Sequence, residues 1–238
     1  MSTARDAIFA GIRRSLKRGP LAPQQQSELR ARVAAHRRNL VPARAAALDH
    51  AARIGLFVRM AEDVQATVAR VPSPSAVPDA VARYLADENL PAELAMAPDP
   101  SLDSIPWETR PLLRIRRGRA EAGDAVSLTP CVAAVAETGT LMLASGARTP
   151  TTLNFLPDTH IVVAYADQAV ASYEDGWDRL RAAADSGSSL PRTVNFVTGP
   201  SRTGDIEQRI VLGAHGPRRL HILVVENRQD AEDGEASG

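Results

Sequence analysis

The hydrophobic positions of the chain follow a helical pattern near the N-terminus and a strand-like pattern further along. In residues 4–18, Ile8, Ile12 and Leu16 recur every four residues among basic side chains, which is the spacing of one helix face. Two more helices are predicted at 23–36 and, in an alanine-rich stretch, at 45–64. We therefore expect an N-terminal helical extension over residues 1–64.

From residue 65 onward, short apolar runs alternate with helical stretches. The runs predict strands at 66–71, 92–97, 112–115, 141–143, 161–164, 194–197 and 221–225, and the intervening patterns predict helices at 77–86, 168–184 and 206–213. The last three runs are continuously apolar, which is typical of strands buried on both faces of a parallel sheet. We expect one α/β domain over residues 65–226, with right-handed crossovers and a site at the C-terminal ends of the strands.

Composition narrows the class of protein. The 238 residues are 44% hydrophobic and 24% charged, an ordinary globular balance. No apolar run approaches the roughly 20 residues that span a bilayer, and the first residues lack the continuous apolar core of a secretory signal. We expect no membrane span.

The single cysteine, Cys131, excludes an internal disulfide and an iron–sulfur cluster built on four local thiolates. It points to a reducing compartment, so we expect a cytoplasmic protein. No two histidines have metal-ligand spacing, so no metal site is predicted. Cys131, His160 and His221 are expected to be structural.

Charge is distributed unevenly although the formal net charge is zero. Residues 1–45 hold ten basic and two acidic residues, and the rest of the chain balances them with an acidic excess. The basic extension either packs as a solvated helical face or docks on an acidic partner. Nucleic-acid binding is not expected, because no groove-reading motif is visible. The acid-rich residues 227–238 are predicted to be a disordered tail.

The first candidate site follows the strand at 194–197 and precedes the helix predicted at 206–213. Its anion-binding candidates are Gly199, Pro200, Ser201, Arg202, Thr203 and Asp205. Free amides at a helix N-terminus beside an arginine favour a carboxylate or phosphate ligand. The alternative is a capped helix without a ligand.

The second candidate site is the segment from Ala136 to Thr140, just before a predicted strand. Glu137 is a candidate nucleophile or general base, and Thr138, Gly139 and Thr140 are candidates for substrate binding. The alternative is an ordinary β-turn in which Glu137 is exposed and Gly139 has a positive φ.

Three further polar residues lie in predicted turns and loops. His215, in a turn rich in glycine, is either an acid/base catalyst or a structural hydrogen-bonding residue. Arg148 and Asn154 occupy the loop between two strands, where they either contact an anion or are solvated.

Taken together and in order, these segments resemble the LUD-domain family, and within it the lactate-utilisation protein C branch. The resemblance covers about residues 65–226. The segments that carry it are 136–140, Leu156-Pro157 before the strand at 161–164, 199–207, and His215-Gly216-Pro217.

The resemblance implies a Rossmann-like α/β sandwich with a mostly parallel sheet, similar to the CoA-transferase and ribose-phosphate-isomerase group. It also implies a role in oxidising L-lactate to pyruvate together with iron–sulfur partner proteins. The chain itself is then expected to hold no cofactor, with the clusters in its partners. Glu137 and His215 remain candidates for catalysis rather than residues with an assigned role.

Two other functions stay open at the level of sequence. One is a free-standing enzyme that uses Glu137 for acyl or CoA transfer, or that isomerises a sugar phosphate. The other is a lactate-responsive regulator. Whether the chain is catalytic alone, and whether it forms a homo-oligomer, is left undecided by the sequence.

Overall fold

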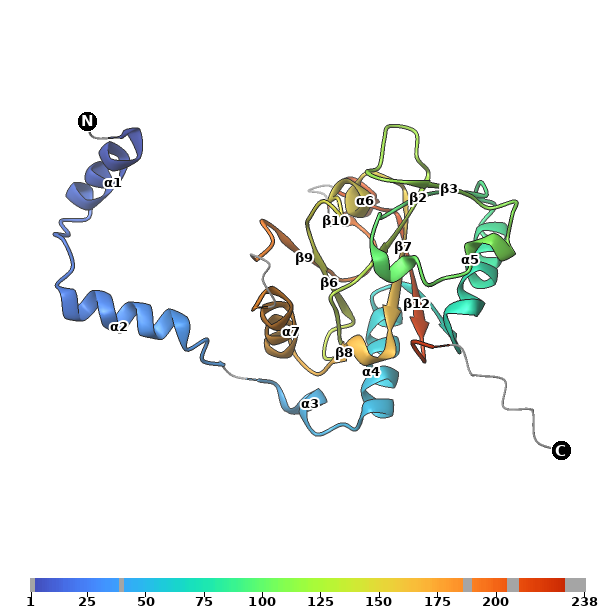
Figure 1. Cartoon of the computed structure of the whole chain (residues 1–238), viewed down its shortest axis with the longest axis horizontal. Coiled ribbons are helices and arrows are strands. Elements are labelled where there is room, and N and C mark those ends of the chain that lie inside the picture. Colours follow the sequence, from blue (N-terminus) through green and yellow to red (C-terminus); the bar gives the residue numbers. More distant parts are fainter. Residues whose placement is uncertain (1–2, 39–40, 186–189, 205–209, 230–238) are drawn as a thin grey trace. The chain divides into compact units, whose positions relative to one another are not determined.

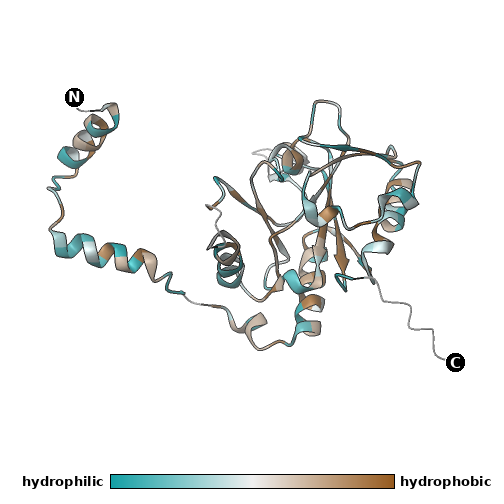
Figure 2. Cartoon of the chain, viewed as in Figure 1, coloured by the Kyte–Doolittle hydropathy of each residue, from teal (hydrophilic) through white to brown (hydrophobic). Residues whose placement is uncertain are grey.

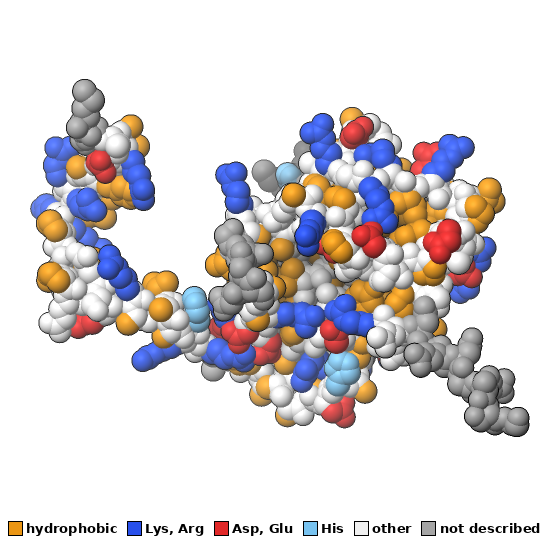
Figure 3. Space-filling model, in the orientation of Figure 1, with side chains coloured by type: hydrophobic (Ala, Val, Ile, Leu, Met, Phe, Trp, Pro, Cys, Tyr) orange, Lys and Arg blue, Asp and Glu red, His pale blue; other side chains and the backbone are white. Residues whose placement is uncertain are grey.

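The computed structural model describes residues 3–38, 41–185, 190–204 and 210–229, and it divides into two compact units, 1–40 and 41–238. The first unit contains α1 (Ala4–Ser15) and α2 (Pro23–Ala34) (Figure 1). Thr3 begins α1 with a capping box, in which its side chain accepts from the Asp6 amide and the Asp6 carboxylate accepts from the Thr3 amide. Lys and Arg side chains lie on the face of these two helices that is seen in Figure 3, among hydrophobic ones.

The second unit is built on a six-stranded sheet in which every neighbouring pair is parallel. Its order is β1 (Thr67–Val71), β12 (Arg219–Val225), β7 (Thr159–Tyr165), β4 (Val126–Pro130), β2 (Glu93–Met96) and β3 (Arg114–Arg117). The register pairs His160 of β7 with Leu220 of β12. The amino ends of β7 and β12 therefore lie side by side at one edge of the sheet.

A smaller sheet of four strands packs beside the first. Its order is β8 (Ala169–Val170), β5 (Ala133–Val135), β6 (Thr140–Ala144) and β9 (Val194–Val197). Only the β5–β8 pair is parallel. A separate antiparallel pair joins β10 (Arg202–Gly204) to β11 (Ile210–Leu212).

Helices cover the two sheets. The α-helices of the second unit are α3 (Ala43–Ala46), α4 (His50–Asp63), α5 (Val77–Asp87), α6 (Thr152–Phe155) and α7 (Tyr173–Asp185), and 3₁₀ turns occur at Pro74–Ala76, Pro100–Leu102, Trp107–Thr109 and Ala166–Gln168. Pro78 lies in the first turn of α5, where its missing amide costs no hydrogen bond.

The core consists of apolar layers on both faces of the six-stranded sheet. Along β7, Ile161 and Val163 face the cluster that contains residues of α5, whereas Val162 and Ala164 face the cluster that contains Phe57 of α4. This alternation explains the continuously apolar sequence, because both faces of the strand are covered. A third cluster packs α7 against the smaller sheet. The strands are accordingly among the most hydrophobic parts of the ribbon (Figure 2).

The predicted fold class, an α/β domain with a mostly parallel central sheet, is confirmed. Two local predictions are wrong. A strand is formed at 194–197 as predicted, but it does not belong to the parallel sheet, because it lies in the smaller sheet and pairs antiparallel with β6. The helix predicted at 206–213 is not formed at its described end, because Ile210–Leu212 is a strand that pairs with Arg202–Gly204. Residues 205–209, which include Asp205, lie outside the described residues.

The boundary of the extension also differs from the expected residue 64, since the compact unit begins at residue 41. The reason is α4, whose side chains Ile54, Phe57 and Ala61 are buried between the sheets. The tail predicted at 227–238 falls mostly outside the described residues, which end at 229.

Candidate functional site

A cavity of about 290 Å³ lies at the amino ends of β7 and β12. His160 and Leu220 contribute from these strands, Asn154 and Phe155 from α6, and Phe196 from β9. The remaining lining comes from the segments 197–202 and 215–217. Two loops that are separated in sequence therefore meet over one hollow.

Six of the candidate residues from the sequence line this cavity, namely Asn154, Gly199, Pro200, Ser201, Arg202 and His215. Ser201 holds the two loops together. Its amide donates to the Pro217 carbonyl at 2.8 Å, and its hydroxyl accepts from the His215 amide at 3.2 Å. The Gly213 amide donates to the Ser201 carbonyl at 3.0 Å.

The location differs from the expected one in two ways. The cavity lies at the amino ends of β7 and β12, whereas a site at their carboxyl ends was predicted. The helix N-terminus that was to supply free amides is replaced by β10, which starts at Arg202. A ligand here would meet side chains and loop backbone rather than a helix dipole.

The cavity has two deeply buried polar residues. His160 is fully buried and Asn154 is 4% exposed. The ring Nε2 of His160 lies 2.8 Å from the Thr129 hydroxyl, and its Nδ1 has no hydrogen-bond partner in the described part of the chain. Burial lowers the pKa of His160 to about 3, so the ring is neutral near pH 7.

The charge in the lining is positive. Arg202 is exposed and lines the cavity, while its guanidinium also donates to the Val64 carbonyl at the end of α4. None of the described residues that line the cavity is acidic. This arrangement favours an anionic ligand, because a carboxylate or phosphate would meet an arginine and, in the described lining, no acidic side chain.

Glu137 is placed elsewhere. It is 7% exposed, and its Oε1 accepts from the Tyr173 amide at 3.3 Å. Its Oε2 is buried without a hydrogen-bond partner among the described residues. The guanidinium of Arg44 donates to the Glu137 carbonyl at 3.1 Å. Glu137 is not among the residues that line the cavity, so the structure does not bring it together with His215.

A cluster of hydroxyl groups connects the Glu137 turn to the cavity. Thr140 lies within 2.9 Å of the hydroxyls of Thr138, Tyr173 and Thr198. Thr198 in turn lines the cavity. Tyr173 was missed by sequence reasoning, because its position at the start of α7 becomes meaningful only when the smaller sheet is formed.

Gly139 of the segment 136–140 and Gly199 of the segment 199–202 permit close packing of these two motifs against α4. Gly139 has a φ of 65°, and a Cβ there would lie 2.3 Å from the Ala61 amide nitrogen. Gly199 has a φ of 70°, and a Cβ there would lie 2.3 Å from the Val64 carbonyl oxygen. Both turns are therefore fitted to α4, which forms a common support for the two motifs.

The other predicted residues lie apart from the cavity lining. Thr203 is in β10, and Arg148 is exposed on the loop after β6. Neither lines the cavity.

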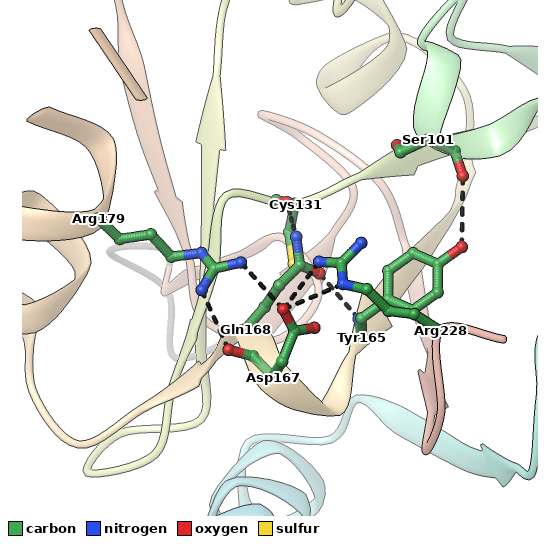
Figure 4. A network of polar contacts seen from close by, with 7 residues as sticks. All are labelled: Ser101, Cys131, Tyr165, Asp167, Gln168, Arg179 and Arg228. Atoms are coloured by element: carbon green, nitrogen blue, oxygen red, sulfur yellow. Dashed lines mark hydrogen bonds and ion pairs between the residues drawn. The ribbon is translucent and has the colours of Figure 1, made fainter. Parts of the chain in front are cut away.

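At the opposite edge of the sheet, a polar network joins the carboxyl ends of β4, β7 and β12 (Figure 4). Asp167 forms ion pairs with Arg179 and Arg228, and Arg228 lies 4.4 Å from the Tyr165 ring centre. Beneath them, Gln168 donates to the Cys131 carbonyl at 2.7 Å. Cys131 is buried as predicted, and burial raises the pKa of its thiol to about 12. The network ties the strand ends together and encloses the thiol.

Among the described residues, none of the helices combines the length and the hydrophobicity that a bilayer span requires. No group of three or more histidine, cysteine, aspartate or glutamate side chains in the same residues is arranged to hold a metal ion.

Comparison with known proteins gives concordant results. Residues 54–225 match the LUD domain model. Lactate utilization protein C of Halalkalibacterium halodurans is 36% identical over 110 residues, covering 46% of this chain and 47% of the relative. Lactate utilization protein C of Deinococcus radiodurans is 34% identical over 157 residues, covering 64% and 70%. The match spans less than half the length of the Halalkalibacterium halodurans relative and of two Geobacillus relatives with the same name.

A solved structure agrees with the fold. The crystal structure of a DUF162 family protein from Deinococcus radiodurans is 29% identical and superimposes with a TM-score of 0.57, covering 75% of this chain and 99% of that one. The domain match covers well over half of the chain and includes both motif turns and the cavity. The chain therefore belongs to the LUD domain family.

Proposed function

We propose that this protein is a component of a lactate-utilising system and that its cavity binds a small carboxylate such as L-lactate or pyruvate. In this proposal, cytoplasmic iron–sulfur partner proteins carry the electrons released when L-lactate is oxidised to pyruvate. The relatives named lactate utilization protein C support the system-level role. The chemistry of the cavity supports the ligand class.

One observation carries the ligand assignment. The cavity combines an exposed arginine, Arg202, with two buried neutral polar residues, Asn154 and His160, and its described lining has no acidic side chain. A guanidinium pairs with a carboxylate through two parallel hydrogen bonds. The volume of about 290 Å³ lies at the small end of the range for ligand pockets, which suits a compact acid.

The number of cysteines decides which protein in the proposed system holds the iron–sulfur clusters. Iron–sulfur clusters are held by several cysteine thiolates, and this chain has a single cysteine whose thiol is buried. The proposed electron carriers are therefore separate proteins, with this chain contributing ligand binding.

A second candidate function rests on Glu137. A buried carboxyl group with an oxygen that has no partner among the described residues is an uncommon arrangement, and a catalytic role is one explanation for it. If the chain were a free-standing acyl- or CoA-transferring enzyme, Glu137→Gln would abolish turnover while the fold was retained. If the chain acts as a subunit, the same variant would retain ligand binding at the cavity.

Calorimetric titration tests the first proposal. L-lactate, pyruvate, CoA and ribose 5-phosphate are added separately to the wild type, to Arg202→Ala, and to Arg148→Ala as a control for an exposed arginine outside the cavity. We expect saturable heat from L-lactate or pyruvate that is lost in Arg202→Ala and kept in Arg148→Ala. If neither acid gives binding heat with the folded protein, or if Arg202→Ala binds as tightly as the wild type, the ligand assignment is contradicted.

The role in the system needs a separate assay. Conversion of L-lactate to pyruvate is measured with the iron–sulfur proteins of the same organism, in the presence and absence of this chain. We expect conversion to depend on the chain. Conversion that proceeds equally without it would contradict the proposed role.

A further inference from the structure

We infer that Asn154 recognises the oxygen on C2 of a short 2-hydroxy or 2-oxo acid whose carboxylate is held by Arg202. This inference rests on the proposed function and specifies the ligand more closely. It concerns which part of the ligand lies deep in the cavity and which part lies at the mouth.

The first observation is the state of the Asn154 side chain. It is 4% exposed and lines the cavity, yet its carboxamide makes no hydrogen bond within the described residues. The oxygen and nitrogen of the carboxamide are not fully buried, so this unbonded side-chain amide faces open space. Because most buried polar side chains are hydrogen-bonded, an amide left open to a cavity points to a ligand that completes it.

The second observation is that Asn154 is held in place. Asn154 lies on the single-turn helix α6, where its backbone N–H donates to the Thr151 carbonyl at 3.0 Å. The preceding residue, Leu153, is fully buried, and its carbonyl accepts from the buried Ser127 hydroxyl of β4 at 2.6 Å. The carboxamide is thus presented from a fixed backbone, which reduces the entropy lost on binding.

The third observation is the order of charges. The buried polar groups, Asn154 and His160, are neutral, whereas the cation, Arg202, is exposed. An acid whose negative end faced inward would bury its charge among neutral groups, at a high desolvation cost. The favoured orientation places the carboxylate at Arg202 and the uncharged oxygen at Asn154.

A carboxamide suits both members of a hydroxy-acid and oxo-acid pair. Its oxygen accepts a hydrogen bond from a hydroxyl, and its NH₂ group donates to a keto oxygen. A site built on such a group discriminates against an analogue that lacks the oxygen, since binding that analogue leaves the amide unpaired.

The test compares L-lactate, pyruvate and propionate, the last of which has the same carbon skeleton without the C2 oxygen. Dissociation constants are measured by calorimetry for the wild type, Asn154→Leu and Arg202→Ala. We expect the wild type to bind L-lactate at least tenfold more tightly than propionate. Asn154→Leu should weaken L-lactate at least tenfold and leave propionate within about twofold, while Arg202→Ala should weaken both acids alike.

The outcomes distinguish a failure of the proposed ligand from a failure of the role assigned to Asn154. If no acid binds to the folded wild type, the proposed ligand and this inference both fail. If binding depends on Arg202 but the wild type does not distinguish L-lactate from propionate, or if Asn154→Leu weakens both equally, only the inference about Asn154 fails. Should Asn154→Leu not fold, as judged by thermal melting, Asn154→Ser replaces it, and loss of the same discrimination is the expected result.

Discussion

The hydroxyl of Thr140 lies 2.7 Å from the hydroxyl of Thr198, although the two residues are 58 positions apart in the chain. Thr140 is the first residue of β6, directly after the turn that contains Glu137, and Thr198 lines the cavity. Because Thr140 also contacts Thr138 and Tyr173, the two motifs share one hydroxyl cluster. The cluster lies where β6 and β9 pair, so the smaller sheet sets the distance between the motifs.

Thr140→Val should lower the free energy of unfolding. The residue is fully buried, and the change leaves the hydroxyls of Thr138, Tyr173 and Thr198 without their common partner. We expect a loss of about 1–3 kcal/mol in urea denaturation. Thr109→Val, which removes an exposed hydroxyl bonded to the Pro106 carbonyl, should cost less than about 1 kcal/mol. Equal effects for the two variants would show that the cluster contributes no special stability.

Gly199→Ala should be strongly destabilising. Alanine would have to adopt a φ of 70°, and its Cβ would lie 2.3 Å from the Val64 carbonyl oxygen, a backbone atom that cannot turn aside. The left-handed conformation alone costs roughly 1–2 kcal/mol, and the overlap with α4 adds to it.

Gly118→Ala is the matched control for the contact with α4. Gly118 also has a positive φ, 137°, but nothing lies within 4 Å of a Cβ built there. We expect Gly199→Ala to exceed Gly118→Ala by at least about 1 kcal/mol of unfolding free energy. Similar losses would mean that α4 moves away at little cost and does not fix the position of the loop.

The sequence predicts the parts of the fold that depend on continuous apolar runs. β7 and β12 are found because both faces of each are covered by hydrophobic layers. β4 is missed because Ser127 and Thr129 interrupt its apolar pattern. Both side chains are buried because they have hydrogen-bond partners there, the Leu153 carbonyl for Ser127 and the His160 ring for Thr129. Such partners cannot be identified from the local sequence.

Only part of the candidate site is predictable from the sequence, because the contacts that assemble it join residues far apart in the chain. The loop of residues 199–202 and His215 meet over one cavity because the hydrogen bonds of Ser201 join them. Glu137 is not in that lining. Its carboxylate accepts from the Tyr173 amide at the start of α7, a contact that forms only when the smaller sheet packs against α7. The helix expected at 206–213 is wrong because the spacing of its apolar residues could not show that Ile210–Leu212 would pair with Arg202–Gly204.

Cys131 should resist thiol reagents in the folded protein. The side chain is buried beneath the polar network of Figure 4, and burial raises the pKa of the thiol to about 12, so almost no thiolate is present near pH 8. We expect very slow labelling by iodoacetamide in buffer and rapid labelling in concentrated urea. Fast labelling in buffer would show that the network opens readily.

Unfolding free energy should fall as the pH is lowered from 6.5 to 5. Burial lowers the pKa of His160 to about 3 and that of His221 to about 4, whereas unfolded histidine titrates near its ordinary value of 6.5. Between these limits the unfolded chain binds more protons than the folded one, so acidification favours unfolding, and above pH 6.5 the two residues add no slope. Each buried histidine contributes up to about 1.4 kcal/mol per pH unit.

His160→Gln isolates the contribution of one ring, because glutamine cannot be protonated in this range. We expect urea denaturation at several pH values to show a slope between pH 6.5 and 5 that is about 1 kcal/mol per pH unit smaller than in the wild type. An unaltered slope in His160→Gln would mean that the folded protein takes up a proton at His160 in this range, and the neutral ring inferred for the cavity would then be incorrect.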